Sequence, residues 1–92
     1  MDLGLNGKSV IVTGGGSNIG RAITLGFAAE GANVTMAELD VDQGGRVAEE
    51  ASGLGGGQVR CLRTDVTELA EVEQLVAAAV EDHGQVDVLV NN

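Results

Sequence analysis

The sequence predicts an α/β fold built on a doubly wound parallel sheet, and three observations support this prediction. Short runs rich in β-branched residues alternate with longer segments of helical periodicity along the 92 residues. The run at residues 9–12 is largely apolar, as expected of a strand that is buried on both faces. The connections are short, and right-handed crossovers then place helices on both faces of a sheet with strand order 3-2-1-4.

The expected order of elements is β-α-β-α-β-α-β. Strands are predicted at residues 9–12, 34–37, 58–63 and 86–90, and helices at about 18–30, 41–54 and 68–83. Gly31 and Gly84 are expected to end the first and third helices. Arg60 and Arg63 indicate that the third strand is less buried than the first, which suits the edge of the sheet.

The second and third helices have recognisable caps and apolar faces. Asp40 is expected to cap the second helix and Thr67 the third. Gly44 and Gly45 should weaken the second helix by roughly 1 kcal/mol each relative to alanine. The inner face of the second helix is predicted to comprise Val47, Ala48, Ala51 and Leu54. The apolar stripe of the third helix is predicted to comprise Leu69, Val72, Leu75, Val76, Ala79 and Val80.

Composition limits the classes of function. The net charge is −9, and the five basic residues are scattered, which argues against nucleic acid and an anionic membrane as partners. No apolar run approaches the roughly 20 residues of a membrane span, and the N-terminus does not resemble a signal peptide. Cys61 is the single cysteine and cannot form an internal disulfide. We therefore expect a cytoplasmic protein.

A glycine-rich turn joins the first strand to the first helix, at residues 13–20. Such a turn places helix N-terminal amide groups and the positive end of the helix dipole at one point, which suits a pyrophosphate. Gly14 would allow the tight turn, Gly16 the close approach of phosphates, and Gly20 close packing of the helix. Ile19 stands where the G-x-G-x-x-G fingerprint has its third glycine, so the turn alone is a weak signal, and a tight connection without a ligand is the less favoured alternative.

Polar groups at the ends of the other strands strengthen the prediction of a Rossmann-type dinucleotide site. Glu38 ends the second strand and lies 24 residues beyond Gly14, close to the spacing of about 20 residues expected for the acid that binds the adenosine ribose. Ser17 and Leu39 are uncharged, so no partner for a 2′-phosphate is evident and NAD is favoured over NADP. Asp65 and the pair at residues 91–92 follow the third and fourth strands at the same edge.

With these motifs the sequence resembles the short-chain dehydrogenases/reductases. The segment at residues 13–20 matches the family's T-G-x-x-x-G-x-G except at Asn18, where asparagine replaces a glycine and best tolerates a left-handed conformation. Asp65-Val66 resembles the family's D-V, which contacts the adenine ring, and Asn91-Asn92 resembles the start of its N-N-A-G. The resemblance implies a cofactor site formed by Gly14, Gly16, Ser17, Asn18, Ile19, Gly20, Glu38, Asp65, Val66, Asn91 and Asn92.

The resemblance also implies an NAD-dependent oxidoreductase that transfers hydride between NAD(H) and a small alcohol or ketone, and a homo-oligomer for the full-length protein. The family's acid/base pair, Tyr-x-x-x-Lys, is absent, because the chain has no tyrosine and its only lysine is Lys8. We therefore expect residues 1–92 to be the N-terminal part of one dinucleotide-binding domain, truncated after the fourth strand and inactive alone. No catalytic residue and no metal site is predicted.

Two single residues and two alternative functions remain to be interpreted from the sequence. His83 is interpreted as a solvated helix end and Cys61 as a small core residue. The chain could instead be a non-catalytic nucleotide-binding module, complete at 92 residues. An S-adenosylmethionine-dependent methyltransferase segment is disfavoured, because its loop usually reads G-x-G-x-G and its first strand carries an acidic residue, which residues 9–13 lack.

Overall fold

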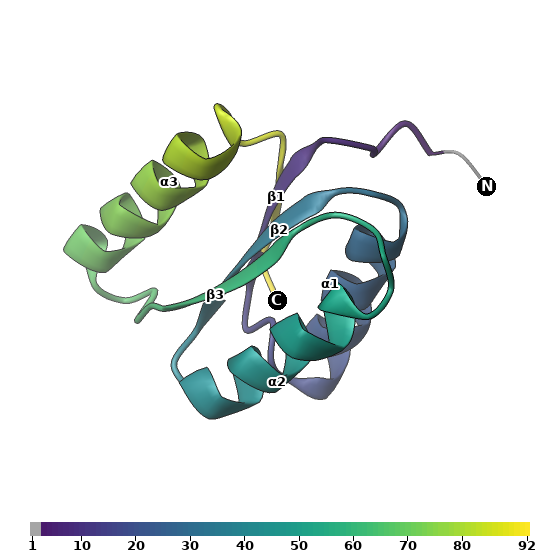
Figure 1. Ribbon diagram of the computed structural model, residues 1–92. Coiled ribbons are helices and arrows are strands. Elements are labelled where there is room, and N and C mark those ends of the chain that lie inside the picture. The colour runs from purple at the N-terminus through teal and green to yellow at the C-terminus, as the bar shows by residue number, and fades with distance from the viewer. Residues whose placement is uncertain (1–2) are drawn as a thin grey trace.

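The computed structural model describes residues 3–92 and contains one four-stranded parallel sheet with strand order β3-β2-β1-β4. The strands are β1 (Ser9–Thr13), β2 (Asn33–Glu38), β3 (Val59–Arg63) and β4 (Val88–Val90). The helices are α1 (Asn18–Ala29), α2 (Val41–Ser52) and α3 (Leu69–His83). Figure 1 shows α1 and α2 on one side of the sheet and α3 on the other. The predicted fold class and strand order are therefore confirmed.

The side chains of the central strands alternate between two hydrophobic clusters, one on each face of the sheet. Val10 and Val12 of β1 and Met36 of β2 pack beneath α1 and α2. Ile11 of β1 and Ala37 of β2 face α3 and contact its two buried residues, Leu75 and Ala79. Covering helices on both faces explain why β1 and β2 are apolar runs rather than alternating sequences.

The first two helices begin as the sequence predicts, and α1 also ends close to the predicted position. The Ser17 hydroxyl accepts a hydrogen bond from the Gly20 amide and caps α1, and Gly31 follows the helix in a left-handed conformation at φ 86°. The Asp40 carboxylate accepts from the Gln43 amide at 3.0 Å and caps α2. Leu54 was predicted wrongly as part of the inner face, because α2 ends at Ser52 and the Leu54 side chain is exposed.

The predicted cap of α3 is wrong. Glu68 occupies the N-cap position and makes no side-chain capping bond, while the Thr67 hydroxyl donates to the Asp65 carboxylate at 2.6 Å. The predicted apolar stripe of α3 is also only partly buried. Leu75 and Ala79 are buried, whereas the exposed large hydrophobic residues of this helix are Leu69, Val76 and Val80. Gly84 ends α3 in a left-handed conformation at φ 82°, as predicted.

The outer strands frame the sheet. β3 lies at one edge and is only half-buried, as its two arginines predicted. β4 begins at Val88, two residues later than predicted, because Asp87 has a different role. The Asp87 carboxylate accepts a hydrogen bond from the Ser9 amide at 2.8 Å, and its own amide donates to the Ser9 carbonyl at 2.8 Å. This exchange fixes where β4 joins β1.

Candidate functional site

The turn between β1 and α1 is closed by hydrogen bonds to its first residue. Gly14 has a left-handed backbone at φ 65°, and its amide donates to the Ala37 carbonyl of β2 at 2.7 Å. The Gly14 carbonyl accepts from both the amide and the hydroxyl of Ser17, at 3.2 and 2.8 Å. This conformation requires glycine at position 14 and directs the start of α1 at the carboxyl edge of the sheet.

Gly20 and Gly16 both stand where a side chain would collide, although the neighbours differ from those expected. A Cβ atom on Gly20 would lie 1.9 Å from the Gly14 carbonyl oxygen, so glycine is needed for the turn itself to close on the helix. A Cβ atom on Gly16 would lie 3.0 Å from the Glu38 carboxylate and 3.2 Å from the Gly44 amide nitrogen. Gly16 therefore allows β2 and α2 to approach the turn.

The explanation offered for Asn18 is wrong. No described residue other than glycine has a positive φ, and Asn18 begins α1 with an ordinary helical conformation. The left-handed tolerance of asparagine is therefore not what makes it acceptable at this position. Asn18 and Ile19 are exposed on the first turn of α1, beside the glycine-rich turn.

Glu38 joins the end of β2 to the glycine-rich turn. Its side chain is half-buried, and one carboxylate oxygen accepts from the Gly16 amide at 2.9 Å. The other oxygen accepts from the Asp40 amide at 3.2 Å, just before α2. The acid predicted to bind a ribose thus lies in direct contact with the turn predicted to bind a pyrophosphate.

The residues after β4 reach the same turn from the opposite side. The Asn92 side-chain amide donates to the Gly14 carbonyl at 3.2 Å and to the Ser17 hydroxyl at 3.0 Å. The Asn92 backbone amide donates to the Thr13 hydroxyl at 3.0 Å, and that hydroxyl lies 3.4 Å from the Asn91 side-chain oxygen. The pair at residues 91–92 therefore supports the glycine-rich turn.

Asp65 and Val66, after β3, complete this edge. The Asp65 carboxylate accepts from the hydroxyl and the amide of Thr67, and these two bonds together with the nearby Arg63 charge lower the pKa of Asp65. The lowered pKa favours the ionised form of the Asp65 carboxylate. Val66 has a 53% exposed apolar side chain, which faces solvent beside it.

A cleft of about 290 Å³ lies at the carboxyl ends of the strands, and six of the predicted site residues line it: Gly14, Glu38, Asp65, Val66, Asn91 and Asn92. The other five lie next to the cleft in the turn and first helical turn: Gly16, Ser17, Asn18, Ile19 and Gly20. The cleft lining also includes residues that were not predicted as site residues, namely Thr13, Ala37, Leu39, Thr64 and Thr67. Each lies at the end of a strand or within four residues after it, which is the signal that could have identified it.

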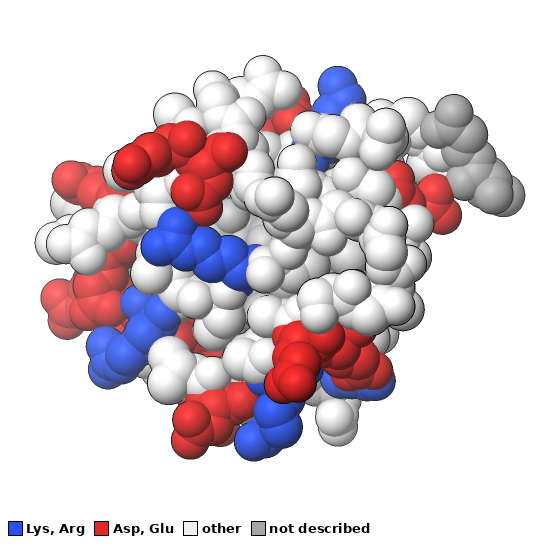
Figure 2. Space-filling model, in the orientation of Figure 1, with Lys and Arg blue, Asp and Glu red and all other residues white. Residues whose placement is uncertain are grey.

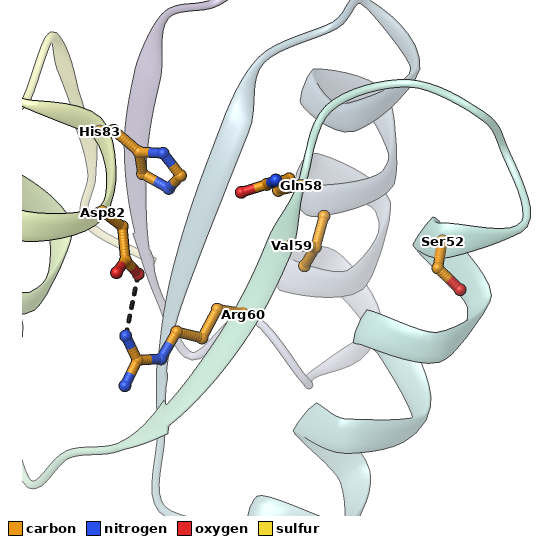
Figure 3. Close-up of a pocket in the computed structure, with 6 residues that line it drawn as sticks. All are labelled: Ser52, Gln58, Val59, Arg60, Asp82 and His83. Carbon is orange, nitrogen blue, oxygen red and sulfur yellow. Dashed lines mark hydrogen bonds and ion pairs between the residues drawn. The ribbon is translucent and has the colours of Figure 1, made fainter.

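A second hollow, of about 580 Å³, opens near the start of β3 and the end of α3 (Figure 3). It is lined by Ser52, Gln58, Val59, Arg60, Asp82 and His83. The charges of Arg60 and Asp82 neutralise each other across a 2.8 Å ion pair. His83 is partly exposed at the last turn of α3. This hollow lacks the glycine-rich turn and the helix N-terminus that an anionic ligand needs, so the carboxyl edge is the better candidate.

Other chemistry finds little support in residues 3–92. Burial, followed by the charges of Glu38 and Asp40, raises the pKa of the half-buried Cys61 thiol, which disfavours a nucleophilic thiolate. The described residues contain no group of three side chains suited to a metal ion. None of the described helices has the length and apolar character to cross a membrane.

Basic side chains are dispersed over the surface. Figure 2 shows several of them directly beside acidic ones on the face that it presents. Among residues 3–92, three ion pairs join arginines to carboxylates, namely Arg21 with Glu50, Arg60 with Asp82 and Arg63 with Glu71. These side chains are at least partly exposed, so the pairs contribute little to stability.

Comparison with known proteins agrees with this geometry. A family model described as short chain dehydrogenase matches residues 8–92. The 7alpha-hydroxysteroid dehydrogenase of Escherichia coli is 40% identical over 91 residues, which are 99% of this chain and 35% of that protein. The galactitol 2-dehydrogenase of Agrobacterium fabrum is 38% identical over 88 residues, which are 96% of this chain and 33% of that protein. The chain thus spans about a third of the length of these relatives.

Solved structures agree. A hydroxysteroid dehydrogenase from Escherichia coli superposes with a TM-score of 0.91 at 40% identity, over 96% of this chain and 37% of that one. A 7 alpha-hydroxysteroid dehydrogenase complexed with NADH and 7-oxo glycochenodeoxycholic acid superposes with a TM-score of 0.90 at 40% identity. That match covers 96% of this chain and 34% of that one.

Proposed function

The chain belongs to the short-chain dehydrogenase family, and from this premise we propose that it forms the NAD-binding part of an oxidoreductase. The proposed reaction of the whole protein is hydride transfer between NAD(H) and a small alcohol or ketone. When bound, NAD supplies the hydride acceptor and NADH the hydride donor. The residues described above would hold and orient this cofactor.

The pyrophosphate would lie at the start of α1. The Gly14 conformation and the missing side chains at Gly16 and Gly20 keep the turn short and close to the start of α1. The first amide groups of a helix have no partner within it and carry the positive end of its dipole, so they favour an anion. The amides of Asn18 and Ile19, the exposed first residues of α1, would be the donors to the pyrophosphate.

The adenosine half would occupy the cleft in front of the sheet. The Glu38 carboxylate offers acceptors for the ribose hydroxyl groups, and its bond to the Gly16 amide places it beside the proposed pyrophosphate position. Val66 provides an exposed apolar surface suited to the adenine ring, with Asp65 and Asn91 at the cleft margin. The observation that carries the proposal is this contact of Glu38 with the glycine-rich turn.

The same carboxylate favours NAD over NADP. A 2′-phosphate would bring about two negative charges toward Glu38, and like charges at short range repel. The adjoining residues Leu39 and Ser17 are uncharged and cannot compensate. Arg63 lies near this edge but is paired with Glu71 at 3.6 Å.

The acid/base chemistry would come from residues outside the present 92, because no tyrosine is present. The role of these residues is to bind the cofactor and to fix its position relative to the rest of the site. For the full-length protein we propose a small-molecule substrate and, as the family resemblance implies, a homo-oligomer. Residues 1–92 alone are expected to catalyse no hydride transfer.

The test is calorimetric titration of the intact protein with NADH and with NADPH. We expect NADH to bind more tightly, and we expect Glu38→Ser combined with Leu39→Arg to shift the preference toward NADPH. Glu49→Ser, which removes an exposed acid of α2 away from the cleft, is the control and should leave the preference unchanged. An unchanged preference in the double variant would remove Glu38 from the ribose role.

Two further measurements, titration with S-adenosylmethionine and the intact mass of the natural protein, test the alternatives to this proposal. Binding of S-adenosylmethionine but not NADH would favour a methyltransferase. A folded natural protein with an intact mass of 9.3 kDa that binds NADH would favour a non-catalytic nucleotide-binding module.

A further inference from the structure

Two adjacent glycines in α2 have very different surroundings. Gly44 is buried, and a Cβ atom there would lie 2.3 Å from the Cys61 sulfur of β3 and 3.4 Å from the Glu38 Cβ atom. Gly45 is exposed, and a Cβ atom there would have no neighbour within 4 Å. Both interrupt a helix in which alanine would be more favourable. Only Gly44 has a packing reason to be glycine.

Gly44 also lies against the glycine-rich turn. Its amide nitrogen would be 3.2 Å from a Cβ atom on Gly16, and the same Cβ atom would be 3.0 Å from the Glu38 carboxylate. The Gly44 amide donates to the Asp40 carbonyl at 2.9 Å, and the Asp40 amide in turn donates to Glu38. Glu38 is therefore held between the turn and the first turn of α2, and Gly44 sets how close these two elements come.

We propose that Gly44 is a positioning residue for the adenosine-ribose site, with the Cys61 sulfur defining the space that forbids a side chain there. This inference rests on the proposed function, because it assigns to Gly44 the placement of the acid that would bind the ribose. A methyl group at position 44 forces α2 away from β3 or displaces Cys61. Because Glu38 and Asp40 lie between α2 and the turn, a movement of α2 away from β3 shifts the Glu38 carboxylate away from the Gly16 amide.

The test compares three variants of the intact protein by titration with NADH and NADPH. Gly44→Ala is expected to weaken NADH binding by about tenfold, as overpacking at a closed contact does. Gly45→Ala makes the same change one residue along the helix and should leave the affinity within about twofold of the original. The double variant Gly44→Ala with Cys61→Ala removes the colliding sulfur and should restore the NADH affinity to within about twofold of the original.

A second readout separates positioning from general loosening of the structure. If Glu38 is misplaced, NADH loses a favourable contact while NADPH is relieved of repulsion. The ratio of the NADH affinity to the NADPH affinity should therefore fall in Gly44→Ala. A loosened domain would weaken both cofactors equally and leave the ratio unchanged, which would contradict the proposal. Failure of Cys61→Ala to rescue the affinity would contradict it as well.

The remaining outcomes are also decisive. If the original protein binds no NADH, the proposed function fails and this inference fails with it. If the original protein binds NADH and Gly44→Ala binds it equally well with the same ratio, this inference alone is overturned. If Gly44→Ala does not fold, the double variant decides: a folded double variant with the original affinity supports the inference, and an unfolded one overturns it.

Discussion

Replacing Gly20 by alanine tests whether the glycine-rich turn is built as described. The added Cβ atom would lie 1.9 Å from the Gly14 carbonyl oxygen, 2.8 Å from its carbonyl carbon and 2.9 Å from the Asn92 side-chain nitrogen. Non-bonded carbon atoms prefer separations of about 3.5 Å or more, so the turn has to retreat by more than about 1 Å. Two of the three colliding atoms belong to the backbone, so a side-chain rotation cannot relieve the contact.

The expected cost follows from these contacts. Overpacking of a closed site costs about 1–3 kcal/mol, and the hydrogen bond from the Gly20 amide to Ser17 contributes about 1 kcal/mol that is lost if the turn moves. Alanine gains up to about 1 kcal/mol from its higher helix propensity. The free energy of unfolding should therefore fall by about 1–3 kcal/mol. A displaced turn would also move the amides that would hold the cofactor. We expect NADH affinity to fall at least about tenfold, which corresponds to about 1.4 kcal/mol of binding free energy.

Urea unfolding and NADH titration of the intact protein measure both effects. Gly26→Ala is the matched control, because Gly26 lies in the same helix and a Cβ atom there meets nothing within 4 Å. The control should be stabilised by up to about 1 kcal/mol and should bind NADH normally. If Gly20→Ala proves as stable as the control and binds NADH equally well, the described closure of the turn is wrong.

Two further variants test the caps and pairings that place the cleft. Asp40→Ala should lower the free energy of unfolding by about 1 kcal/mol through loss of the α2 cap, measured by urea unfolding; no loss would contradict the capping bond to Gln43. The pKa of Asp87 is lowered from 3.8, chiefly by the hydrogen bond from the Ser9 amide, so its stabilising effect is present above about pH 4 and lost as pH falls through the lowered pKa. Asp87→Asn should therefore be less stable than the original protein at neutral pH, with the difference shrinking below pH ~4; a difference independent of pH would show that the charge is not involved.

The sequence predicted the order of elements well, because strand runs and helical periodicity depend on local residues. The first strand and helix could be read from residues 9–31, where apolar runs, a cap and a terminating glycine agree. Errors arose where two local interactions compete. Thr67 is a good capping residue in isolation, but Asp65 lies two residues earlier, and the Thr67 hydroxyl donates a hydrogen bond to its carboxylate instead of capping α3.

Periodicity also cannot tell whether an apolar residue is covered. Leu69 and Val76 follow the same helical stripe as Leu75, yet they are exposed while Leu75 packs against Ile11 and Ala37. Burial depends on which neighbouring element lies over each position, and a helical repeat carries no information about that.

The residues of the candidate site could be predicted as a group because parallel strands end at one edge of a sheet. Their mutual contacts could not. The bond between Glu38 and Gly16 and the approach of Gly44 to Cys61 depend on how closely α2 packs against β2 and β3, which no local pattern reports. The same holds for Asn92, whose side chain reaches Ser17 from the far end of the chain.

The most direct test of the account is a crystal structure of the intact protein with NADH. The account predicts the pyrophosphate at the first turn of α1 and the adenosine ribose hydroxyl groups on the Glu38 carboxylate, with the adenine ring beside Val66. A cofactor bound elsewhere, for example in the hollow bordered by Arg60 and His83, or bound at the turn without contact to Glu38, would contradict it.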